Sequence, residues 1–193
     1  MPDYKVVLGI LTIAIGILSY SFYFRDVFRG KTRPDAFSWL IWGVLASVIF
    51  FAQNATHGGP GAWATAFTAI VCYLIAITAY IRGDGRIKLI DAISLIGAAI
   101  GVCLWYYTSD PLYTVLCAVG VGALGFVPTF RKAFKKPQEE TTITYFLNGL
   151  KFAVAIVALE SFTPVTWLYP GALVVLNMSL ASMLYLRRST RSR

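Results

Sequence analysis

The chain has few of the residues from which metal sites, disulfide frameworks and hydrolytic active sites are built. Its 193 residues include one histidine, three cysteines and nine acidic residues, and only 13% of the residues are charged. The cysteines stand singly within apolar runs, without the paired spacing of a metal or redox motif. Neither HExxH nor Gly-x-Ser-x-Gly occurs. We therefore expect no cofactor, no metal site and no catalytic residues, and an enzyme is the least favoured function class.

Most of the chain is apolar. Hydrophobic residues make up 58% of the chain and the mean hydropathy is +0.68, well above an ordinary soluble domain. A transmembrane helix must cross a hydrocarbon core of about 30 Å. Seven runs are long enough, so we expect an all-α integral membrane protein with seven transmembrane helices, at about 6–24, 36–53, 61–81, 89–107, 111–129, 141–159 and 163–186.

The basic residues gather at the ends of alternate apolar runs. The formal net charge of +8 alone would suit nucleic-acid binding, but 15 of the 17 Lys and Arg residues lie in segments 25–33, 82–88, 131–136 and 187–193. By the positive-inside rule this pattern places the N-terminus outside and the C-terminus in the cytoplasm. We expect membrane lipids, not nucleic acid, to meet these clusters, and a bacterial inner membrane is the favoured location.

One stretch recurs 106 positions further along the chain. FRDVFRGKTRPDAFSWLIWG (24–43) aligns without a gap on FRKAFKKPQEETTITYFLNG (130–149), and the same offset pairs Arg82 with Arg188. Identity is low elsewhere, so matched hydropathy and the absence of gaps support an internal repeat. The plan that follows is a three-helix repeat at 1–86, a linker helix at 87–108, a second three-helix repeat at 109–188 and a basic tail at 189–193.

This 3+1+3 plan sets the relation between the repeats. Because each repeat has an odd number of helices, a second copy joined directly to the first would have the opposite orientation in the membrane. The single linker helix restores the original orientation. Both repeats then run parallel about a pseudo-twofold axis along the membrane normal, and carriers of this kind hold their substrate between the repeats near mid-membrane.

The sequence also resembles known families. Pro128-Thr-Phe-Arg-Lys-Ala-Phe-Lys-Lys is similar to the pattern that opens the second repeat of SWEET sugar transporters and PQ-loop proteins, and Trp39-Leu-Ile-Trp42 resembles the WxxW of PnuC vitamin transporters. The resemblance implies the 3+1+3 fold and transport of a sugar, a vitamin or a small anionic or polar metabolite. It implies a substrate-facing role for Asn177 and a hinge role for Pro128, although the offset places Val71 and Phe22 opposite them.

Lys151 lies near the middle of the sixth apolar run, where insertion scales assign a charge a cost of about 2.5–3.5 kcal/mol. Either it faces the central cavity and neutralises an anionic substrate or a coupled proton, or it is structural, snorkelling or paired with carbonyls. Asn148 lies one turn away on the same face, and Trp42 is its repeat partner. We expect Trp42, Asn148, Lys151 and Asn177 to bind substrate.

Four further residues lie nearer the cytoplasmic ends of their helices. Trp39 and Tyr145 belong either to an inner gate or to the aromatic belt of the interface. Ser38 and Thr144 either line that gate or bond back to their own helix carbonyls. The gate interpretation groups these four residues with the hinge at Pro128.

The pattern as a whole predicts a small-solute facilitator that alternates access by rocking one three-helix repeat against the other. The scarcity of carboxylates within the apolar runs argues against proton-driven pumping. The alternative, from another class, is a seven-helix receptor or sorting protein of the same fold that binds its ligand without moving it. Self-association into a homo-oligomer is left open.

Overall fold

The computed structural model describes residues 3–32, 34–82 and 89–191, and within these ranges the chain is helical with no β-strand. This confirms the all-α prediction. The α-helices of these ranges are α1 (Tyr4–Phe28), α2 (Ala36–Ala55), α3 (Trp63–Ile81), α4 (Leu89–Thr108), α5 (Pro111–Lys135), α6 (Thr142–Val157) and α7 (Pro164–Arg191). Two short 3₁₀-helices, η1 (Gly59–Ala62) and η2 (Pro137–Glu139), precede α3 and α6.

Five helical segments of the described chain are long and apolar enough to cross a membrane: α1, α2, the η1–α3 segment, α5 and α7. A membrane protein is therefore supported, whereas the full set of seven spans remains a prediction. α6 has 16 residues, which at 1.5 Å per residue is only about 24 Å. It ends at Val157, two residues before the predicted end of its apolar run.

The scarce acidic residues serve partly as helix caps. Asp3 accepts a hydrogen bond from the backbone N–H of Lys5 at the start of α1, and Asp35 does so for Ser38 at the start of α2. Asp110 caps α5 in the same way, directly before Pro111 at the first helical position. A carboxylate satisfies N–H groups that have no partner within the helix, so each cap marks where an apolar run begins.

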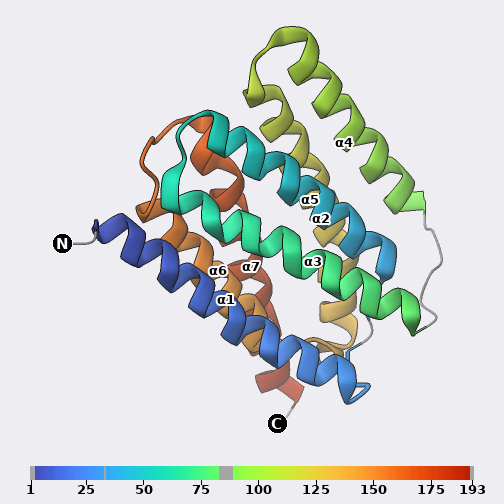
Figure 1. The fold of residues 1–193 in the computed structure, drawn as a ribbon. Helices are drawn as coiled ribbons and strands as arrows, with labels where there is room; N and C mark the ends of the chain where they lie inside the picture. Colours follow the sequence, from blue (N-terminus) through green and yellow to red (C-terminus); the bar gives the residue numbers. More distant parts are fainter. Residues whose placement is uncertain (1–2, 33, 83–88, 192–193) are drawn as a thin grey trace.

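Six of the helices form a closed ring, in the order α1, α3, α2, α5, α7, α6 and back to α1 (Figure 1). In the first triplet, α1–α3, helix α3 lies between α1 and α2. In the second triplet, α5–α7, helix α7 lies between α5 and α6. α4 lies outside the ring at one edge of the bundle, packed against α5 and more lightly against α2.

Positions 106 apart make similar contacts in the two triplets. Gly43 lets α2 approach α3, because a Cβ there would lie 2.9 Å from Cε1 of Tyr73. Gly149 lets α6 approach α7, because a Cβ there would lie 2.9 Å from Cε of Met178. At the ends of the third helices, Arg82 donates to the Val27 carbonyl at 2.8 Å, and Arg188 to the carbonyls of Pro137 and Glu140.

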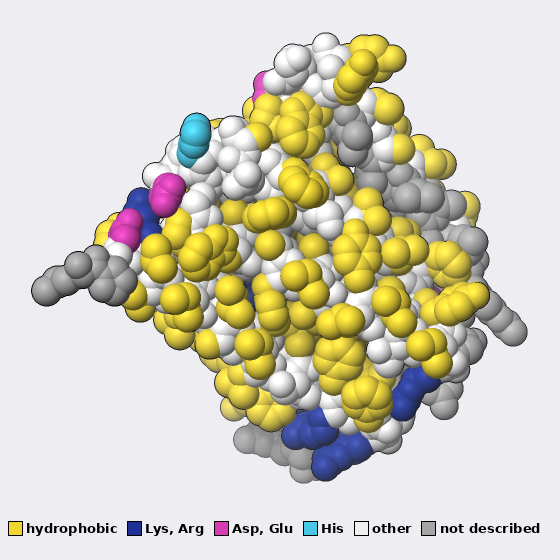
Figure 2. Space-filling model, viewed as in Figure 1, with side chains coloured by type: hydrophobic (Ala, Val, Ile, Leu, Met, Phe, Trp, Pro, Cys, Tyr) yellow, Lys and Arg dark blue, Asp and Glu magenta, His cyan; other side chains and the backbone are white. Residues whose placement is uncertain are grey.

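The surface of the bundle matches a lipid environment. The face in Figure 2 is mostly hydrophobic, and Lys and Arg side chains gather at its lower end. We call this the inner end; the ends of α1 and α7 and the start of α6 lie there. The outer end carries η1 and residues 158–163 (Figure 1). Of the predicted basic clusters, residues 33, 83–88 and 192–193 lie outside the described part of the chain.

Candidate functional site

A cavity of about 70 Å³ lies inside the ring, and all six ring helices contribute to its wall. Eight of its sixteen lining residues are aromatic. Small-molecule sites usually measure about 300–1,000 Å³, so this conformation is closed around the centre of the bundle. We call this space the central cavity; it is lined by Tyr20, Tyr23, Trp39, Trp42, Leu45, Thr68, Cys72, Gly122, Phe126, Thr144, Tyr145, Asn148, Phe152, Tyr169, Leu173 and Asn177.

Six of the nine residues singled out in the sequence come together at this cavity. The predicted substrate residues Trp42, Asn148 and Asn177 line it. So do the predicted gate residues, which are Trp39, Thr144 and Tyr145.

The other three predicted residues are not among the described residues that line the cavity. Lys151 is not among the lining residues. Ser38 lies in the first turn of α2, where Asp35 caps its backbone N–H at 3.0 Å, and it too is not part of the wall. The side chain of Pro128 lies outside the described residues, so its hinge role stays a prediction.

One side of the wall is a continuous run of aromatic rings. The Tyr23 and Trp39 ring centroids are 5.2 Å apart, those of Trp39 and Trp42 5.1 Å with an edge-to-face angle, and those of Trp42 and Phe126 5.7 Å. Such pairs contribute about 0.5–1.5 kcal/mol each beyond their buried area. This run joins α1 through α2 to α5, and therefore links the two triplets across the cavity.

Both amides of the wall lie in the second triplet, Asn148 on α6 and Asn177 on α7. Asn177 donates from Nδ2 to the Leu173 carbonyl of its own helix at 2.8 Å. Asn148 is 7% exposed, and its Oδ1 is buried with no hydrogen-bond partner among the described residues. A buried acceptor left unpaired costs about 1–3 kcal/mol, and such a group in a native structure requires an explanation. A polar ligand in the cavity would supply the missing donor.

Lys151 lies directly behind this wall and is completely buried. Its Nζ donates to Oγ1 of Thr68 at 2.8 Å, and Thr68 lines the cavity. The same nitrogen lies 4.4 Å from the ring centroid of Phe152 and 5.1 Å from that of Tyr20. Among the described residues no carboxylate forms an ion pair with it. Hydroxyl and ring faces, rather than carbonyls, therefore surround this ammonium, and they come from α1, α3 and α6.

Hydrogen bonds between the triplets close the inner end of the cavity. Ser19 donates to the Thr144 carbonyl at 3.0 Å, and Thr144 donates in return to the Ser19 carbonyl at 3.3 Å. One turn further inward, Thr141 Oγ1 donates to Oδ2 of Asp26 at 2.7 Å. These bonds join α1 to the start of α6, and the Thr144 hydroxyl donates to α1 rather than back to its own helix, while its gate role stays a prediction.

The outer end is closed by fewer side chains. Gln53 is fully buried and donates from Nε2 to the Thr166 carbonyl at 2.7 Å, which joins α2 to α7. Two backbone bonds add to this, from Glu160 N–H to the Gly58 carbonyl at 3.3 Å and from Ser161 N–H to that of His57 at 3.1 Å. Access to the central cavity from either side therefore requires the triplets to separate.

Several site residues were not singled out in the sequence. The offset of 106 pairs Tyr20 with Phe126, and an acidic residue within a basic cluster marks Asp26, so these three carried a usable signal. Thr68 and Tyr169 carried none, because a threonine or tyrosine within an apolar run is compatible with any helix face.

Comparison with known proteins adds no further assignment. No family model matches the chain, and no match is found among curated proteins or solved structures. The candidate site is thus defined by its own geometry: a closed, ring-lined cavity with two amides, a buried lysine behind its wall, and hydrogen-bonded closures at both ends.

Proposed function

We propose that the protein is a small-solute transmembrane carrier of the 3+1+3 type, with the central cavity as its substrate site. The order of helices in the ring supports this plan, since each triplet packs its third helix between its first and second and α4 lies outside as a linker. The resemblance to SWEET, PQ-loop and PnuC transporters points to the same plan. The N-terminus would face outside and the basic inner end the cytoplasm.

The two closures suggest how access would alternate. Each consists of a few hydrogen bonds between the triplets, and a hydrogen bond contributes only about 0.5–1.5 kcal/mol net. Rocking the triplets apart at the inner end would break the Ser19–Thr144 and Asp26–Thr141 bonds, while the Gln53–Thr166 bond keeps the outer end closed. The reverse motion would open the other side.

The wall of the cavity indicates the kind of solute. Aromatic rings offer flat apolar surfaces, the amides of Asn148 and Asn177 offer hydrogen bonds, and Lys151 offers a positive charge close behind Thr68. A sugar, a vitamin or a small anionic or polar metabolite with a flat or ring portion would suit these groups. At about 70 Å³ the cavity is smaller than a typical small-molecule site, so loading requires the triplets to separate.

The observation that carries the proposal is the unpartnered Oδ1 of Asn148 in a cavity shared by both triplets. A thermal-shift screen of sugars, vitamins, nucleosides, amino acids and small carboxylates would find the ligand, because binding only the folded state raises its stability. We expect Asn148→Ala to abolish the shift. Asn54→Ala, at the exposed end of α2, is the matched control and should leave the shift unchanged.

Flux of the identified compound into sealed liposomes then separates carrier from receptor. Uptake that is lost in Asn148→Ala and kept in Asn54→Ala supports a carrier. Binding at the cavity without uptake would instead indicate a receptor or sorting protein of the same fold. Binding and uptake unaffected by Asn148→Ala would place the substrate elsewhere and refute the site.

A further inference from the structure

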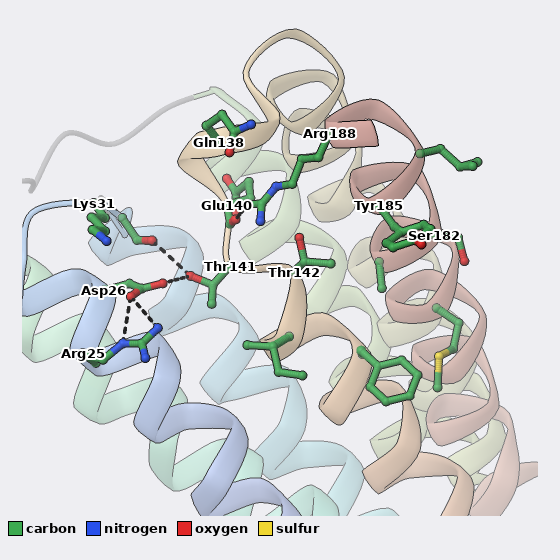
Figure 3. A pocket seen from close by; sticks show the side chains of 16 residues that line it. Arg25, Asp26, Lys31, Gln138, Glu140, Thr141, Thr142, Ser182, Tyr185 and Arg188 are labelled. Carbon is green, nitrogen blue, oxygen red and sulfur yellow. Dashed lines mark hydrogen bonds and ion pairs between the residues drawn. The ribbon is translucent and has the colours of Figure 1, made fainter. Parts of the chain in front are cut away.

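A second hollow, of about 950 Å³, opens at the inner end of the bundle between the end of α1, the start of α6 and the end of α7. Figure 3 shows Lys31 and Asp26 on one side of it, Ser182 and Tyr185 on the other, and the start of α6 between them. Of the described residues that line this hollow, none also lines the central cavity. We call it the interfacial groove, and it needs an explanation of its own.

The polar half of the groove carries a net positive charge. Its two carboxylates already have partners: Asp26 is paired with Arg25 at 3.1 Å, and Glu140 with Lys132 at 2.9 Å. Lys31 and Arg188 also line the groove, and within the described residues neither forms an ion pair with a carboxylate. The groove therefore offers positive charge to an anion.

The start of α6 adds a second polar feature to this half. Thr141 precedes α6 but gives its hydroxyl to Asp26, so no side chain caps the helix. The next hydroxyl, Oγ1 of Thr142, is buried without a hydrogen-bond partner among the described residues. An uncapped helix start with a cationic residue nearby is a favourable place for a phosphate group.

The other half of the groove is apolar and open. Ile143 and Phe146 on α6 are 41% and 48% exposed, and Tyr185 and Leu186 on α7 are 72% and 65% exposed. These side chains belong to the hydrophobic outer surface of the bundle. A soluble anion would use only the charged half of the groove, whereas an amphipathic molecule would contact both.

We propose that the interfacial groove binds one anionic phospholipid from the leaflet at the inner end. Its phosphate would sit between Lys31 and the start of α6, and an acyl chain would run along Phe146 and Tyr185. Because Asp26 and Thr141 form both the edge of the groove and the inner closure, a lipid bound there would contact the residues that join the triplets. This site goes beyond the carrier function and does not depend on it.

Native mass spectrometry of the detergent-purified protein tests the site with phosphatidylglycerol and phosphatidylcholine of identical chains. We expect the anionic lipid to bind more tightly, and Lys31→Gln to weaken it about fivefold, as expected for one basic side chain near anionic lipid. Arg29→Gln is the matched control. Arg29 lies two residues before Lys31 and does not line the groove, so this change removes the same charge from outside the site. Both positions are exposed, so both variants should fold.

Two further measurements test whether the acyl chain and the phosphate of the lipid both contribute to binding. Phe146→Ala should weaken lipid binding, whereas Phe51→Ala, at a more exposed phenylalanine near the outer end of α2, should not. Inorganic phosphate at millimolar concentration should fail to displace the lipid. Equal binding of the two lipids, equal losses in Lys31→Gln and Arg29→Gln, or displacement by inorganic phosphate would each overturn the proposal.

Discussion

The two triplets use positions 106 apart for the same packing but for different chemistry. Gly43 and Gly149 both bring a second helix against a third. At the cavity, by contrast, the first triplet presents Trp42 where the second presents Asn148, and Leu45 where the second has Lys151. The repeated part is thus the scaffold. The asymmetry lies in the binding surface, because each triplet contributes four aromatic rings to the cavity wall whereas both amides come from the second triplet.

After Asn148→Ala, which should abolish binding, the largest effect is expected from Lys151→Met. It removes the buried charge and keeps the volume, so binding of an anionic ligand should weaken by about tenfold, because the charge acts on the cavity from behind Thr68. Stability should stay unchanged or rise, since no described carboxylate is paired with Lys151, so its removal leaves no unpaired charge and ends the cost of burying the ammonium. Binding isotherms and thermal unfolding in detergent measure the two effects. A strong loss of stability with unchanged binding would instead make Lys151 a purely structural residue.

A smaller effect should separate the two matched glycines. Gly43→Ala should cost about 1–3 kcal/mol, because the Tyr73 ring it meets is held by a hydrogen bond to Ser47 at 3.0 Å. Gly149→Ala should cost under about 1 kcal/mol, because it meets the flexible side chain of Met178.

Thermal unfolding midpoints check this ranking, with Gly120→Ala as the control. A Cβ at Gly120 would meet nothing within 4 Å, so that variant should be neutral or stabilised by the better helix propensity of alanine. Equal losses at Gly43 and Gly149 would contradict the difference in packing between the triplets.

The smallest effect is expected at Trp42, one of the aromatic rings that line the cavity. Trp42→Phe keeps a ring next to Trp39 and Phe126 but removes the indole N–H and part of the surface. Ligand affinity should fall only a few-fold, within the range of about 0.5–1.5 kcal/mol for one aromatic contact. If Trp42→Phe abolished binding as completely as Asn148→Ala, the assignment of a ring contact to Trp42 and of the main polar contact to Asn148 would be wrong.

Much of this arrangement could be predicted from the sequence, for identifiable reasons. Long apolar runs predict helices directly, and a repeat offset brings Trp42 and Asn148 to matching places without any knowledge of packing. The position of Lys151 near mid-membrane leaves two interpretations open in the sequence, a cavity-facing residue or a structural one. Only the packed structure shows that Thr68, Tyr20 and Phe152 enclose the lysine behind the cavity wall.

Other features depend on contacts that no sequence pattern encodes. The sequence groups Ser38 with the gate, but its place in the capped first turn of α2 keeps it out of the cavity wall. The closures arise between residues more than a hundred positions apart, such as Gln53 with Thr166 and Asp26 with Thr141. Only the packed bundle brings these groups together.

Alternating access is the central claim, and labelling of Cys72 tests it most directly. Cys72 lines the central cavity and is buried, so with Cys103 and Cys117 replaced by serine it reports whether the cavity is open. A membrane-impermeant maleimide is applied to one side of oriented proteoliposomes. Thr141→Val, which weakens the inner closure, should increase labelling only from the inner side, and Gln53→Leu only from the outer side. Labelling from both sides in either variant, or from neither side in both, would contradict a carrier that opens one end at a time.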